Sequence, residues 1–156
     1  MSQDKVDLFL GVLTERLPRV SVLDDGFAEQ VGRGPLLAIM RRLATEILAF
    51  YLESFPIAAS VFSDPYLLNC HREALRERSA GPERLVQAVT EYLSAEQQAG
   101  RVAATARPEV LAELLVGACL HRAFLVRFAG ETISPVRIRR FASDMVSALE
   151  PVLDGR

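Results

Sequence analysis

Residues 107–130, RPEVLAELLVGACLHRAFLVRFAG, decide the fold class of this chain. Pro108 stands at a first helical position, where its missing N–H costs no hydrogen bond, and Gly130 is suited to close the helix. Apolar residues occupy nearly every side of the helix predicted over 108–129: Val110, Leu111, Leu114, Leu115, Val116, Cys119, Leu120, Phe124, Leu125 and Val126. A helix that is apolar almost all round must be covered on more than one side. The core of its own subunit covers one side, and a second copy of the protein is the simplest cover for the other.

Proline and glycine divide the rest of the chain into further helices. Pro56 is expected to kink the chain at the end of one of them and to begin a short turn that runs to Phe62. Asp64 and Ser134 are predicted helix N-caps. Strand alternation, internal repeats and low-complexity tracts are not evident, so the sequence predicts one all-α domain over residues 1–156, with six or seven helices. The remaining predicted helices cover residues 3–17, 35–55, 65–79, 82–99 and 135–152.

Composition limits the possible function classes. A chain of 156 residues is long enough to bury a real core, and its net charge of −2 argues against a dedicated nucleic-acid binder, which needs a basic surface. Two cysteines do not make a disulfide scaffold, which favours a reducing compartment. The N-terminus does not resemble a signal peptide, and the longest uncharged apolar run, Leu114–Leu120, is far shorter than the roughly 20 residues of a membrane span. We therefore expect a soluble cytoplasmic protein.

The last two predicted helices form an antiparallel hairpin joined by the short loop GETIS, residues 130–134. Two such hairpins can build a four-helix bundle across a dimer axis, and Gly117 and Ala118 would allow close helix approach. In the alternative arrangement, the helix over 108–129 is the central helix of a monomeric bundle. The predicted dimer interface consists of Leu114, Leu115, Ala118, Arg122, Leu125, Ile138, Phe141, Met145 and Leu149.

Several stretches of the chain resemble one protein family. SQDKVDLFLGVLTERLP (2–18) is similar to the helix that joins the DNA-binding head to the body in tetracycline-repressor-like (TetR family) regulators. Three later stretches resemble the body of these regulators: FYLESFPIAASVFSDP (50–65), GPERLVQAVTEYLSAEQQAGRV (81–102) and RPEVLAELLVGACLHRAFL (107–125). The resemblance covers nearly the whole chain and consists of helix lengths, caps and apolar positions.

The resemblance implies an all-α body that dimerises through its last two long helices and holds a small, mostly apolar effector between the helices of each protomer. It implies a regulator and not an enzyme, with no cofactor. In the family, effector binding shifts the body between two arrangements, and the opening helix transmits the change to a helix-turn-helix head. That head would precede Met1, so we expect DNA contact only if it lies upstream or on a partner chain.

Six residues are candidates for an effector pocket because each combines predicted inward placement with a ring or a polar group. They are Phe50, Tyr51, Ser54, Tyr92, His121 and Phe124. The alternative is ordinary core packing. His121 in particular has two interpretations. It either faces a cavity or the dimer interface, or it is a core histidine that donates a hydrogen bond to a backbone carbonyl.

A rival hypothesis is a small helical enzyme or metal protein that uses histidine and cysteine. The pairs Cys70-His71 and Cys119-x-His121 cannot chelate one ion from a single helix, because side chains one or two positions apart point in different directions. The basic run Arg137–Arg140 could contact phosphate or an acidic partner. Its alternative is a solvated face in which Arg140 pairs with Asp144.

Overall fold

The computed structural model describes residues 4, 8, 11, 15–77 and 81–155. These residues are helical wherever they are regular, and no strand occurs among them. Residues 4, 8, 11 and 15 are α-helical, and two short 3-10 helices, η1 (Ser21–Leu23) and η2 (Phe27–Gln30), lie between them and α2. The α-helices are α2 (Leu36–Phe62), α3 (Pro65–Glu77), α4 (Arg84–Gln98), α5 (Pro108–Phe128) and α6 (Pro135–Asp154). The all-α prediction is confirmed, while most of the predicted helix over 3–17 lies outside the described residues.

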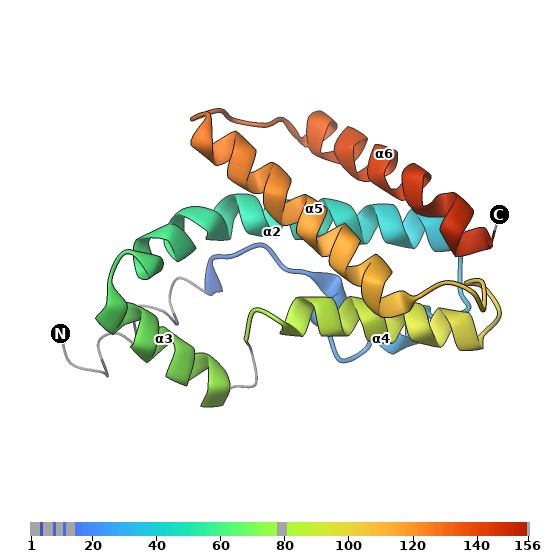
Figure 1. The fold of residues 1–156 in the computed structure, drawn as a ribbon, viewed down its shortest axis with the longest axis horizontal. Helices are drawn as coiled ribbons and strands as arrows, with labels where there is room; N and C mark the ends of the chain where they lie inside the picture. The colour runs from blue at the N-terminus through green and yellow to red at the C-terminus, as the bar shows by residue number, and fades with distance from the viewer. Residues whose placement is uncertain (1–3, 5–7, 9–10, 12–14, 78–80, 156) are drawn as a thin grey trace.

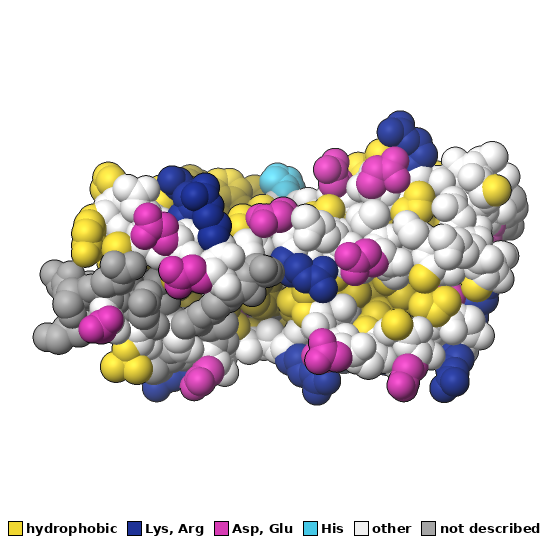
Figure 2. Space-filling view, turned by 90° about the horizontal axis from the view of Figure 1, so that it is seen from below, with side chains coloured by type: hydrophobic (Ala, Val, Ile, Leu, Met, Phe, Trp, Pro, Cys, Tyr) yellow, Lys and Arg dark blue, Asp and Glu magenta, His cyan; other side chains and the backbone are white. Residues whose placement is uncertain are grey.

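Helix α5 is the centre of the packing. It crosses α2 and contacts α4, while α6 returns beside it and also packs on α2 (Figure 1). Helix α3 extends from the far end of α2, on the side of the molecule opposite to α6 (Figure 1). On the face shown in Figure 2, acidic and basic side chains are interspersed, with apolar side chains between them. This face therefore carries no extended field of one sign.

The apolar side chains form one large core and one small cluster. The large core is built by α2, α4, α5 and α6, and fully buried Leu43, Ile47 and Leu115 belong to it. Val20, Val22 of η1 and Phe27 of η2 join it from the segment before α2. The small cluster is separate and contains Val61 of α2 and Cys70 of α3, with Leu67 and Leu68 against them.

Helix α2 does not end near Phe55. The prediction of a turn over residues 56–62 is wrong, because the helix continues through Pro56 to Phe62. Proline removes the N–H that would bind the carbonyl of Leu52, four residues earlier. That carbonyl instead accepts a hydrogen bond from Arg127 Nε of α5 at 2.8 Å. A contact from another helix thus satisfies the backbone at this proline.

Both predicted N-caps are confirmed. Asp64 Oδ1 accepts hydrogen bonds from the backbone N–H groups of Tyr66 (2.9 Å) and Leu67 (3.3 Å) at the start of α3. Ser134 Oγ accepts from Arg137 N at 3.3 Å at the start of α6. These bonds satisfy backbone donors that the first turn of a helix leaves free.

One helix of the described part of the chain has the length and composition to cross a membrane. It is α2, with 27 residues and a mean hydropathy of 1.2. A core helix of a water-soluble domain can meet the same criterion, and α2 packs against both α5 and α6.

Candidate functional site

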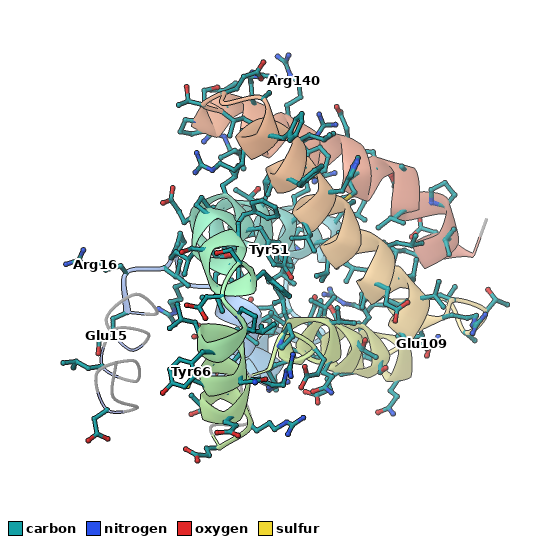
Figure 3. All side chains as sticks on the ribbon, turned by 60° about the vertical axis from the view of Figure 1, so that its left-hand side comes forward. Glu15, Arg16, Tyr51, Tyr66, Glu109 and Arg140 are labelled. Carbon is teal, nitrogen blue, oxygen red and sulfur yellow. The ribbon has the colours of Figure 1, made fainter. Side chains whose placement is uncertain are left out.

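Three of the six predicted effector residues lie together on α2. The core-facing side of this helix carries Met40 and Ile47, both fully buried. One turn further on, the same side presents Tyr51 and then Ser54, which are only partly buried, and Phe50 lies beside them. Figure 3 shows Tyr51 inside the helical framework. The cover over the core side of α2 is therefore incomplete around Phe50, Tyr51 and Ser54, and we call these three side chains the open face.

Tyr51 is the polar group of this open face. Its ring packs edge-on against Phe50, with ring centroids 5.5 Å apart. Burial raises the pKa of Tyr51, and the nearby Cys119 raises it further, so the hydroxyl stays neutral at physiological pH. None of the described residues forms a hydrogen bond with this hydroxyl. The group can therefore donate to, or accept from, a bound molecule.

The other three predicted effector residues lie elsewhere. Tyr92 is 3% exposed, and its hydroxyl donates to Glu96 Oε2 at 2.8 Å, so this residue belongs to the core. Phe124 and His121 are exposed on the outer side of α5, although the Phe124 ring also packs edge-on against Phe55 at 5.6 Å. The alternative of a core histidine at 121 is wrong. The structure thus does not assemble the six residues into one pocket.

A buried ion pair that the sequence analysis did not single out lies at the end of α4. Glu96 is fully buried, and its carboxylate accepts four hydrogen bonds. Oε1 accepts from Gly32 N (2.7 Å) and Arg101 Nε (3.2 Å), and Oε2 accepts from the Tyr92 hydroxyl (2.8 Å) and Arg101 Nη2 (2.7 Å). One sequence signal was available: Glu96 lies four residues after Tyr92 and three after Leu93, on the apolar side of its helix.

These contacts determine the charge state of Glu96. Burial alone would raise the pKa of its carboxyl group, because the charged form loses its hydration. Hydrogen bonds from Arg101, Gly32 and Tyr92 outweigh this effect, and the pKa of Glu96 lies below its ordinary value. Burial and the bond to Glu96 raise the pKa of Tyr92. With its acceptors filled, the Glu96 carboxylate connects the segment before α2 to α4 and is not available for acid–base chemistry.

The outer side of α5 is apolar and largely uncovered. Leu114 is 56% exposed and Phe128 is 82% exposed, and Leu125 and Phe124 are exposed between them. A Cβ atom added to Gly117 in the middle of this side would meet nothing within 4 Å. Leu115, by contrast, is fully buried in the subunit's own core and so is not available to a partner. The prediction that Leu115 belongs to the dimer interface is therefore wrong, because α5 is oriented with Leu115 toward its own core.

The remaining predicted interface residues border this outer side. Ala118 of α5 is partly buried, and α6 contributes Ile138, Phe141, Met145 and Leu149, which are partly buried against the large core. Exposed Arg122 of α5 places its guanidinium 4.9 Å from the centre of the Phe141 ring. We use the name α5–α6 face for the surface formed by Leu114, Gly117, Ala118, His121, Arg122, Leu125, Phe141 and Met145.

Two of the hollows on the surface of the described residues bear on the predicted sites, and none of the six predicted effector residues lines either of them. One has a volume of about 250 Å³ and lies between α5 and α6, with Arg122, Arg137 and Arg140 around an apolar floor. Glu131 and Asp144 also line it, and no ion pair joins Arg140 to Asp144 in the described part of the chain. The other, of about 440 Å³, lies where Arg19 and Asp24 face Arg42 and Glu46 of α2. Figure 3 shows Arg140 at the outer end of α6, as expected for a solvated basic run.

The cysteine and histidine pairs point apart, as helical geometry requires. Cys119 is fully buried, its thiol donates to the Ala44 carbonyl at 3.6 Å, and burial raises its pKa to about 12. His121 is exposed on the other side of the same helix. Over residues 15–77 and 81–155, no three histidine, cysteine, aspartate or glutamate side chains form a group that could hold a metal ion. His71 is half-buried, and burial lowers its pKa.

Comparison with protein-family models, curated proteins and solved structures finds no match to this chain. The open face of α2 and the α5–α6 face are therefore the features of the chain that bear on its function.

Proposed function

We propose that this chain is the effector-binding and dimerisation module of a TetR-like transcriptional regulator. It forms a homodimer through the α5–α6 face in the cytoplasm, and each subunit binds a small, mostly apolar molecule at the open face of α2. It acts as a sensor and not as an enzyme, and DNA contact belongs to a helix-turn-helix head on this or a partner chain. The uncovered apolar side of α5 is the observation that carries the proposal.

Physical chemistry favours a partner on this side of α5. Leu114, Leu125 and Phe128 leave apolar area in water. Complete burial of a fully exposed side chain of this kind contributes about 1.5–3 kcal/mol, and these residues would gain the part that corresponds to their exposed area. Gly117 weakens a helix interior by about 1 kcal/mol relative to alanine, and inside the subunit nothing packs against it. A glycine here does allow a second helix to approach closely. In a two-fold dimer every such contact forms twice.

The open face supports the sensing part of the proposal. Phe50 supplies apolar contact area for a ligand. Tyr51 and Ser54 are partly buried, and each supplies a hydroxyl group at the edge of the core. Tyr51 of α2 lies near Cys119 of α5, so a ligand that contacts Tyr51 would bind close to the place where these two helices meet. A molecule that fits one arrangement of α2 and α5 better than another shifts the population toward that arrangement.

Sedimentation velocity over a range of micromolar concentrations tests the dimer. We expect the wild-type chain to sediment as a dimer and the double variant Leu114→Asp/Leu125→Asp to sediment as a helical monomer. Gly117→Leu should also weaken the dimer, because the added side chain meets only the partner. The matched control is Glu113→Gln, also exposed on α5. A wild-type monomer at the highest concentration would contradict the proposal.

Fluorescence titration with the apolar probe 1-anilinonaphthalene-8-sulfonate tests the open face. Ser54→Trp should fill this face and reduce the binding signal, with the dimer unchanged. Ala38→Trp, at an exposed position near the start of α2, is the control. Equal probe binding by wild type and both variants would show that the open face is not a ligand site.

A further inference from the structure

The backbone of α2 is incomplete at one point within the helix. Pro56 has no N–H group, so the carbonyl of Leu52 receives no hydrogen bond from its own helix. Leu52 is buried, so bulk water does not readily replace the lost donor. A buried carbonyl without a partner costs about 1–3 kcal/mol.

Arg127, in the last turn of α5, supplies the missing donor. Its Nε lies 2.8 Å from the Leu52 carbonyl oxygen, and its Nη2 lies 3.8 Å from Glu53 Oε1. The side chain is 31% exposed, so the guanidinium bridges the interior and the surface. One arginine thus closes a gap in the hydrogen bonding of a helix 75 residues away in sequence.

The chain beyond Pro56 is a distinct packing unit, which we call the arm (residues 57–77: the end of α2, the connection and α3). Its buried residues, Val61 and Cys70, form the small cluster that is separate from the large core. Helix α3 packs chiefly against α2 (Figure 1). Among the described residues, the arm therefore has few apolar contacts that fix its direction relative to α5.

We infer that Arg127 is a latch that holds the arm at a hinge centred on Pro56. While the Arg127 guanidinium donates to the Leu52 carbonyl, the direction of α2 across Pro56 is fixed and the arm keeps one position relative to α5. Without it, the carbonyl is unpaired and the arm moves as a unit while the large core stays folded. The inference rests on these contacts and not on the proposed function.

A second proline provides an internal contrast. Pro151 lies inside α6 and leaves the Ser147 carbonyl without a helical donor. Ser147 is exposed, so water can take that place. Of these two carbonyls, only the buried one of Leu52 needs a side-chain donor in place of water. Pro151 is therefore a control for Pro56.

A double-mutant cycle tests the latch. Arg127→Met in the wild-type background should lower the thermal midpoint by about 3–8 °C. In a Pro56→Ala background, where the backbone N–H is restored, the same substitution should cause less than about half of that loss. Pro56→Gly also restores the N–H and permits a wider range of backbone angles, so it replaces Pro56→Ala if the alanine variant does not fold correctly. Equal losses with and without Pro56 would overturn the inference.

Controls and a local readout complete the test. Arg42→Met removes an exposed arginine of α2 and should be additive with Pro56→Ala, and Arg127→Met should be additive with Pro151→Ala. Hydrogen exchange of Arg127→Met should become faster across residues 57–77 by on the order of tenfold, with the large core unchanged. Exchange that rises equally throughout the chain would mean that Arg127 stabilises the whole fold and is not a latch.

Discussion

At the scale of single residues, Glu96 shows how a buried charge is tolerated in a small helical domain. Its carboxylate accepts hydrogen bonds from the positively charged Arg101 side chain, the Tyr92 hydroxyl and the backbone N–H of Gly32. These bonds offset the loss of hydration that burial imposes. The arrangement is stable only while all partners are present, since removing one side of a buried pair leaves the other uncompensated.

Glu96→Ala should therefore destabilise the protein by about 3 kcal/mol, because it leaves Arg101 and the Tyr92 hydroxyl without their acceptor. Urea unfolding monitored by circular dichroism measures the change. Glu91→Ala is the matched control on the same helix, where an exposed pair with Arg84 at 3.8 Å should contribute less than about 1 kcal/mol. Equal effects of the two variants would show that the buried pair does not contribute more than a surface pair.

The free energy of unfolding should also depend on pH through the titration of Glu96. The pKa of the folded group lies below its ordinary value of 4.5, so its stabilising contribution is present above that value and is lost as the pH falls through the folded pKa. The free energy of unfolding of wild type should thus approach that of Glu96→Gln as the pH falls below 4.5. A difference between the two proteins that stays constant over this range would refute the assignment.

At the scale of elements, a helix start can be tested independently of the core. Asp64→Ala removes the acceptor for the first N–H groups of α3 and should cost about 1 kcal/mol. Hydrogen exchange should show the loss at the start of α3, since the cap acts on that turn. Asp25→Ala, at an exposed position before η2, should leave exchange in α3 unchanged. Unchanged exchange in both variants would exclude a capping role for Asp64.

The elements also show what the sequence could predict. The start of α5 at Pro108 follows from local residue types, and this prediction was confirmed. The passage of α2 through Pro56 could not be predicted, because it depends on Arg127, which approaches only in the folded chain. For the candidate site, periodicity placed Phe50, Tyr51 and Ser54 on one helix. It could not show that Tyr92 binds Glu96 or that His121 faces outward, because these depend on how α4 and α5 are turned.

At the scale of the whole molecule, covering the α5–α6 face would couple stability to protein concentration. If the folded state is the dimer, mass action raises the thermal midpoint of the wild-type chain as its concentration rises. Leu114→Asp/Leu125→Asp should show a lower midpoint that does not change with concentration. Differential scanning calorimetry measures both. A wild-type midpoint that is independent of concentration would indicate that folding and association are separate.

The bond between Gly32 and Glu96 has a consequence for the order in which the chain folds. It joins two groups that are 64 residues apart, and bringing such distant points together costs more chain entropy than closing a helical turn. Individual helices form within about a microsecond, so α4 exists before its partner segment arrives. The segment that contains Gly32 therefore docks on α4 after that helix has formed, in a later step than the formation of the individual helices.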